Sequence, residues 1–211
     1  AQINMYVNLP HHFKGTHMSR FVEILNEFRG RINIKTFETI LARVREKLQA
    51  ESAHMEIDFP YFIEKTAPVS GAGSLMEYRC TFTGIHTAGK MDFCVGVAVP
   101  VTTVCPCSKE ISASGAHNQR GEVRYSVRFG EPIWIEDLVR VVEQSASSEL
   151  FSVLKRPDEK MVTEYAYDHP VFVEDLVRNV AVRTRQDPNV KWFRVEAENQ
   201  ESIHNHNAYA M

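Results

Sequence analysis

Residues 90–129 read KMDFCVGVAVPVTTVCPCSKEISASGAHNQRGEVRYSVRF and carry the clearest structural signal in the chain. Residues 90–101 and 122–129 are rich in β-branched and aromatic side chains, which is typical of β-strands. The segment between them is polar and contains glycine, which is typical of a loop. We therefore predict two strands around a long polar loop, the kind of segment in which proteins place functional groups.

Outside this stretch, the same order of elements is predicted in each half of the chain. Apolar spacing near 3.6 residues indicates paired helices, and strand-like runs lie before and after each pair. Further strands are expected at residues 5–10, 53–63, 74–85, 191–200 and 203–210, and helices at residues 19–28 (with Ser19 as N-cap), 35–48, 135–151 and 172–186.

This order predicts an α+β fold made of two tandem modules, residues 1–85 and 86–211. The links between strands, such as residues 68–73, are of hairpin length, which favours antiparallel sheets with paired helices on one face. The exposed edges of such small sheets need covering. We therefore expect edges to pair between subunits and the chain to form a homo-oligomer.

Composition excludes several classes of protein. The 211 residues are 44% hydrophobic and 24% charged, which indicates neither disorder nor a membrane protein. The net charge of −3 disfavours a general nucleic-acid binder. No apolar run approaches the roughly 18 residues that span a bilayer, and the first residues lack an export signal. We expect a cytoplasmic protein. We also expect residues upstream of Ala1, because the sequence opens in the middle of a strand-like run.

The four cysteines fall into two groups. Without an export signal they are expected to be reduced, and Cys80 and Cys94, within strand-like runs, are expected to be buried and inert. Cys105 and Cys107 lie in the polar loop with His117. Thiolate and imidazole ligands suit a borderline-soft divalent ion, and a catalytic site would add one carboxylate. The alternative is a surface loop with incidental thiols.

A second candidate cluster is the segment from Glu201 to Asn207, which contains His204 and His206. In an extended strand, side chains two residues apart point to the same face, so the two imidazoles are predicted to be neighbours. Such a pair suits metal binding or proton transfer. The alternative is that the two histidines are exposed and have no role. Glu201 is a weaker candidate, and the same alternative applies to it.

Two acidic residues complete the candidates. Glu174 is predicted on the apolar face of its helix, while Asp175 points with Arg178 to solvent. A carboxylate on a buried face needs a partner, and the paired N–H donors of a guanine edge would supply one. The alternative is a first-turn glutamate favoured by the helix dipole. Glu159 reads as a solvated acid in the connection between two helices.

Five basic residues are candidates for binding a polyphosphate. This expectation rests on charge type alone, and the run around Lys14 lacks P-loop spacing. The residues are Lys14, His17, Arg20, Lys109 and Arg120.

These motifs together resemble those of the GTP cyclohydrolase IB family, a branch of the tunnelling-fold (T-fold) superfamily. The similar segments are HFKGTHMSRF (12–21), TTVCPCSKEIS (102–112), GAHNQRG (115–121), HPVFVEDLVRN (169–179) and IHNHNAYA (203–210). The resemblance implies two T-fold modules per chain and a homotetramer with active sites at subunit interfaces. It also implies hydrolysis of GTP to 7,8-dihydroneopterin triphosphate and formate, the first step of folate biosynthesis, with queuosine-type pathways as a second destination.

The resemblance also assigns roles to matching residues. It implies that a divalent metal, Mn, Zn or Fe, is held by Cys105, His117 and Glu159, and that Glu174 anchors the purine. His204 would carry the main proton transfer with His206 beside it, and Cys105 belongs to the catalytic set. The substrate contacts would be Cys107, whose role stays open, with Lys109, Arg120 and Glu201.

Two other functions remain open from the sequence. One is a related T-fold enzyme that uses Cys105 as a covalent nucleophile, as nitrile reductases of the superfamily do, with a nicotinamide and no metal. The other is a catalytically silent purine- or pterin-binding module, in which Glu174 still anchors the ligand. Substitution of Cys105 separates them, because only the cyclohydrolase would lose both metal and turnover.

Overall fold

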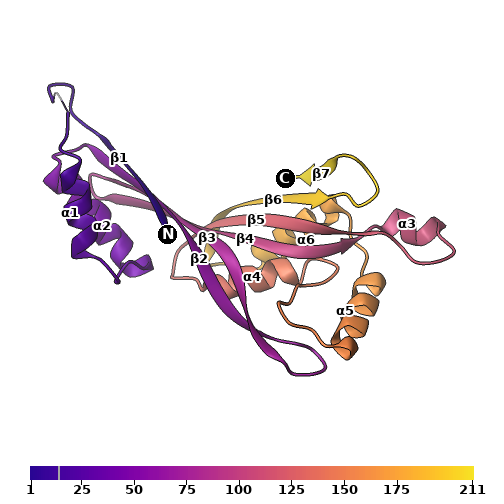
Figure 1. Cartoon of the computed structure of the whole chain (residues 1–211). Coiled ribbons are helices and arrows are strands. Elements are labelled where there is room, and N and C mark those ends of the chain that lie inside the picture. Colours follow the sequence, from indigo (N-terminus) through magenta and orange to yellow (C-terminus); the bar gives the residue numbers. More distant parts are fainter. Residues whose placement is uncertain (14) are drawn as a thin grey trace. The chain divides into compact units, whose positions relative to one another are not determined.

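The computed structural model describes residues 1–13 and 15–211, so the candidate phosphate contact Lys14 lies outside the described residues. Seven strands and six helices are found in those residues (Figure 1). The strands are β1 (Gln2–Asn8), β2 (Ser52–Thr66), β3 (Gly73–Thr87), β4 (Lys90–Val104), β5 (Asn118–Phe129), β6 (Val190–Gln200) and β7 (Asn207–Ala210). The helices are α1 (Ser19–Glu27), α2 (Ile34–Lys47), α3 (Pro106–Ile111), α4 (Ile135–Glu143), α5 (Arg156–Asp168) and α6 (Val173–Arg185).

The seven strands form one sheet in which the order in space is the order in the chain. The pairs β1–β2, β5–β6 and β6–β7 are antiparallel. The predicted α+β class is therefore confirmed. No helix in the described part of the chain is both long and apolar enough to cross a membrane.

Contacts divide the chain into two compact units. The first consists of Ala1–Phe59 and Thr81–Gly96, and the second of Pro60–Cys80 and Val97–Met211. The predicted module boundary near residue 85 falls within the first unit. Because compactness does not test whether two halves repeat one architecture, the division into tandem T-fold modules stays a prediction.

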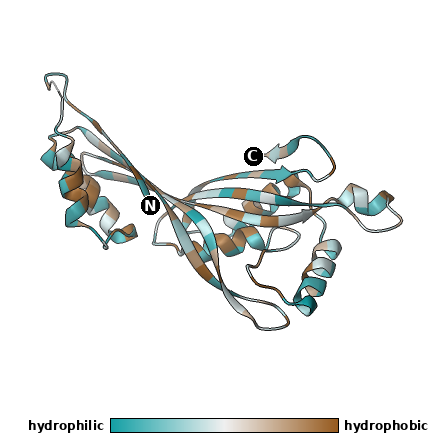
Figure 2. Cartoon of the chain, viewed as in Figure 1, coloured by the Kyte–Doolittle hydropathy of each residue, from teal (hydrophilic) through white to brown (hydrophobic). Residues whose placement is uncertain are grey.

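In the first unit, α1 and α2 pack their apolar residues inward, and Figure 2 shows these residues interleaved with polar ones along both helices. The Asn33 side chain accepts hydrogen bonds from the backbone of Lys35 and Thr36, which fixes where α2 begins. The Phe37 ring lies over Gly84 so closely that an added Cβ there would meet its Cε1 at 2.4 Å. Glycine thus permits α2 to approach β3.

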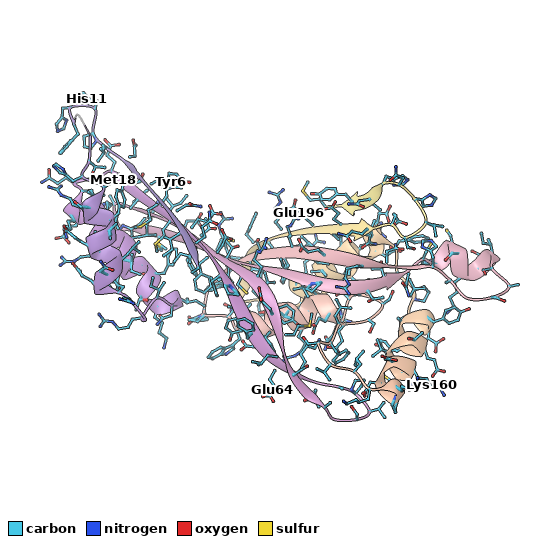
Figure 3. The ribbon with its side chains drawn as sticks, viewed as in Figure 1. Tyr6, His11, Met18, Glu64, Lys160 and Glu196 are labelled. Atoms are coloured by element: carbon cyan, nitrogen blue, oxygen red, sulfur yellow. The ribbon has the colours of Figure 1, made fainter. Side chains whose placement is uncertain are left out.

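In the second unit, β5 alternates buried and exposed residues, and Val123, Tyr125 and Val127 form the buried row. The helices α4 and α6 contribute Leu138 and Leu176, among other apolar residues, to the same core. At the other side of β6, the Tyr209 hydroxyl of β7 donates to Glu196 at 2.7 Å (Glu196 is labelled in Figure 3). This bond helps to hold the four-residue strand β7 on the sheet.

Several predicted bounds were wrong. Helix α4 ends at Glu143 rather than at residue 151. The serines that follow bond to β4 instead: the Ser147 hydroxyl accepts from the Val104 amide at 3.0 Å, and Ser148 forms a bridge with Thr102. These long-range bonds to β4 take the place of the hydrogen bonds that would continue the helix.

Two helices went unpredicted, and one cap was misplaced. Helix α5 lies in the connection expected to be irregular, and α3 in the expected polar loop. Both begin with a proline at the first or second position, where its missing N–H costs nothing. Ser19 is the first helical residue of α1, and Met18 occupies the N-cap without a side-chain bond.

Candidate active site

The two candidate metal ligands Cys105 and His117 are joined by backbone and side-chain hydrogen bonds. Cys105 follows the end of β4 and caps α3, and its amide donates to the His117 carbonyl at 3.1 Å. The Ser108 hydroxyl donates to the Cys105 carbonyl at 3.0 Å and accepts from the His117 amide at 3.1 Å. Ser108 therefore clamps the two candidate ligands from the first turn of α3.

The loop after β6 folds back onto this junction. The β5–β6 register pairs Arg120 with Gln200, so residues just before and after this pair come together. The Ser202 hydroxyl lies 3.3 Å from His117 Nδ1, and Gln119 Nε2 donates to Glu201 at 3.1 Å. The loop after β6 thus contacts His117 and Gln119, although the two segments are more than eighty residues apart in the chain.

His204 and His206 lie in this loop rather than in a strand, since β7 begins at Asn207. The strand-alternation argument for their proximity was therefore wrong. Their rings are nevertheless stacked, with centroids 5.2 Å apart and planes at 11°. Both are exposed, which leaves the imidazoles open to solvent or ligand.

Glu159 and Glu174 differ from their predicted settings. Glu159 lies in the first turn of α5 rather than in an irregular connection, and it is exposed. Glu174 lies in the first turn of α6 and is also exposed, so its predicted place on the buried face was wrong. The helix buries Val173, Leu176, Val180 and Thr184 instead, and Asp175 pairs with Arg178 as expected.

The residue preceding Glu159 is an acid held by several hydrogen bonds. Asp158 is fully buried and accepts hydrogen bonds from the Val69 and Ser70 amides, the Ser70 hydroxyl and the Lys155 amide. These bonds hold its pKa well below the ordinary value against the opposing effect of burial. The tip of the β2–β3 hairpin is thereby tied to the start of α5.

The candidate cations are spread over both units. His17 and Arg20 lie in the first unit, and Lys109 and Arg120 in the second. Lys109 donates to the Tyr167 carbonyl at 2.5 Å, with its amine 4.2 Å from the centre of the Tyr167 ring. Arg120 is exposed and lines a cavity of about 340 Å³ together with Thr102, Asn118, Gln119, Gln200 and Ser202.

Within the described residues, no group of three or more His, Cys, Asp or Glu side chains is placed to hold a metal ion. The chain brings Cys105 and His117 together, but Glu159 does not complete a triad with them. Cys107 is exposed on α3. Cys80 is buried as predicted, and burial raises the pKa of its thiol to about 12, whereas Cys94 is half-buried.

Sequence reasoning did not single out the serines and the glutamine that organise the site. Ser108 and Ser202 carry no spacing signal, because their partners come from distant segments. The same holds for Gln119, whose partner Glu201 is 82 residues away in the chain.

Comparison with known proteins gives the family. A model of the type I GTP cyclohydrolase folE2 family matches residues 1–210. The chain belongs to this GTP cyclohydrolase family. It is 70% identical over 210 residues to "GTP cyclohydrolase FolE2" of Syntrophus aciditrophicus, covering all of this chain and 82% of the relative. A relative from Citrifermentans bemidjiense has the same name. It is 61% identical over 210 residues, and the match covers all of this chain and 78% of the relative.

Solved structures extend this result to the fold. The uricase from Arthrobacter globiformis matches with a TM-score of 0.54 at 11% identity, covering 94% of this chain and 73% of the uricase. A urate oxidase mutant from Bacillus sp. TB-90 matches with a TM-score of 0.54 at 10% identity, covering 91% and 74%. At such identities these matches support the fold of the cyclohydrolase-family chain and not its chemistry.

Proposed function

We propose that this chain hydrolyses GTP to 7,8-dihydroneopterin triphosphate and formate, the first step of folate biosynthesis. The observation that carries the proposal is the family match over residues 1–210, together with 70% identity to a relative named as a GTP cyclohydrolase. The backbone bonds that link Cys105 to His117 support it, because they hold a thiol-bearing and an imidazole-bearing residue in one junction.

The test is incubation of the purified protein with GTP and a series of divalent metals. We expect formate release and, after oxidation, a fluorescent pterin in equal amounts. Loss of both products in a Cys105→Ala variant would tie turnover to the candidate site. Absence of product with manganese, zinc and iron alike would contradict the proposal.

The donor set fits a divalent metal in part. Cys105 and His117 supply one soft and one borderline ligand, a combination suited to zinc, iron or manganese. Glu159 is the proposed third ligand, and the described residues of one chain leave it apart from the other two. A neighbouring subunit is therefore the proposed source of the carboxylate. A metal so held would lower the pKa of water and polarise the group under attack.

The remaining candidates bind the substrate and move protons. The exposed carboxylate of Glu174 is free to accept two hydrogen bonds from guanine N1–H and the 2-amino group. Arg120, exposed beside the cavity, is placed to attract a phosphate. The stacked imidazoles of His204 and His206 are the proposed proton donor and acceptor.

Three further substrate contacts are proposed, and they differ in the bonds that their side chains already make: Cys107, Lys109 and Glu201. Cys107 is exposed on α3 and free for ligand. Lys109 already bonds to the end of α5, so it would need to leave Tyr167 to reach a phosphate. Glu201 accepts a hydrogen bond from Gln119 at one carboxylate oxygen, Oε1.

We further propose a homotetramer with active sites at subunit interfaces. Large apolar side chains that are more than 60% exposed support such an assembly, among them Tyr6, Met18, Leu75 and Trp134. Subunit interfaces would cover side chains of this kind and bring a second copy to each site.

A further inference from the structure

In the described residues, only one of the two polar atoms of the Gln119 side chain forms a hydrogen bond. Gln119 is only 8% exposed, and its amide nitrogen donates to Glu201 Oε1 at 3.1 Å. Its carbonyl oxygen is buried and has no hydrogen-bond partner among the described residues. Buried acceptors are nearly always paired, so an unpaired one on a residue that lines a cavity indicates a missing donor.

The orientation of this carboxamide follows from chemistry. An ionised carboxylate accepts hydrogen bonds and donates none, so the amide nitrogen of Gln119 must face Glu201. The carbonyl oxygen is therefore fixed as the free end. A ligand that satisfies it must bring an N–H or O–H donor.

The surroundings of Gln119 identify the kind of ligand. The cavity of about 340 Å³ that it lines also exposes Arg120, which favours an anion, and Ser202, whose hydroxyl lies 3.3 Å from His117 Nδ1. The cavity thus adjoins the Cys105–His117 junction. Its volume is at the lower end of ligand sites, as expected for the part that holds one portion of a nucleotide.

We infer that Gln119 is a substrate-binding residue whose carbonyl oxygen accepts a hydrogen bond from a ribose hydroxyl of GTP. This inference rests on the proposed function. The triphosphate oxygens are acceptors near neutral pH and cannot satisfy another acceptor. The guanine donors N1–H and the 2-amino group are assigned to Glu174. The ribose hydroxyls are the donors of GTP that remain, and they lie between the base and the phosphates.

The test compares binding of GTP, 2′-deoxy-GTP and 3′-deoxy-GTP to wild type and to Gln119→Met, which keeps the length of the side chain and removes the acceptor. Calorimetry of the metal-free protein measures binding without turnover. We expect Gln119→Met to weaken GTP roughly fivefold to tenfold, and to leave unchanged the affinity for the one analogue that lacks the contacted hydroxyl. Gln186→Met, at the exposed end of α6, is the matched control and should change none of the three affinities.

The possible results separate clearly. Equal weakening of all three nucleotides, or no weakening of any, would overturn the assignment of Gln119 while leaving the proposed function intact. Wild-type protein that neither binds nor converts GTP would overturn the proposed function and this inference with it. If the methionine variant does not fold, Gln119→Asn withdraws the carbonyl by one carbon and should show the same loss of discrimination.

Discussion

At the scale of single residues, Glu174 is exposed although its spacing in the sequence predicted a buried position. Helical spacing placed it on the apolar face, but Val173 takes the buried position and Glu174 faces outward. An exposed carboxylate in a first helical turn is favoured by the helix dipole, so it costs the fold little. The side chain is therefore available for a ligand or for a neighbouring subunit.

Replacement of Glu174 tests that availability. We expect Glu174→Gln to raise the KM for GTP roughly tenfold to a hundredfold, because one charged acceptor of two guanine donors becomes a neutral amide. The neighbouring Asp175→Asn, which breaks only an exposed pair with Arg178, is the control and should leave KM within about twofold. Steady-state kinetics measures both. Equal effects of the two substitutions would count against a guanine contact.

At the scale of elements, α5 is held in place by its first turn. Both oxygens of Asp158 accept hydrogen bonds, from two backbone amides and a hydroxyl of the β2–β3 hairpin tip and from the amide that precedes α5. An amide in place of the carboxylate would turn one of these oxygens into a donor facing donors. Glu159 is the next residue, so the same hydrogen bonds fix the position of this candidate metal ligand's backbone.

We expect Asp158→Asn to lower the melting temperature by roughly 5–10 °C, since buried donors lose their acceptor. Asp168→Asn, at the exposed far end of α5, is the matched control and should change it by no more than about 1 °C. Scanning calorimetry would measure both variants. An unchanged melting temperature for Asp158→Asn would show that the hairpin and helix hold their places without this carboxylate.

At the scale of the whole molecule, the candidate metal site is split. Cys105 and His117 are joined within one chain, and Glu159 stands apart from them in the described residues. An oligomer with interface sites would resolve the split, because a second copy can bring its own α5 to the junction.

Complementation between two inactive variants tests the shared site. If each site takes Cys105 from one subunit and Glu159 from another, mixed oligomers of Cys105→Ala and Glu159→Ala contain some intact sites. Random mixing of equal amounts should restore about one quarter of wild-type activity. The variants are co-expressed with different tags, and the doubly tagged oligomers are assayed. No recovery in such oligomers would place all three ligands in one chain.

Much of the fold was predictable from local pattern. The strands β2 to β6 and the helices α1, α2 and α6 were expected within a few residues, because their apolar periodicity spans several turns or alternations. The helices α3 and α5 were not predicted, since their sequences are polar and neither has a wide buried face. Their order comes from tertiary bonds such as those of Asp158 and Lys109.

The sequence by itself determined the α+β class, the family and the candidate residues, because strand and helix periods are local and the family motifs are contiguous. The tertiary structure decided which candidates meet. It joined Cys105 to His117, set Gln119 against Glu201 and turned Glu174 outward. Those outcomes depend on strand register and on hydrogen bonds between segments far apart in the chain, which no local pattern encodes.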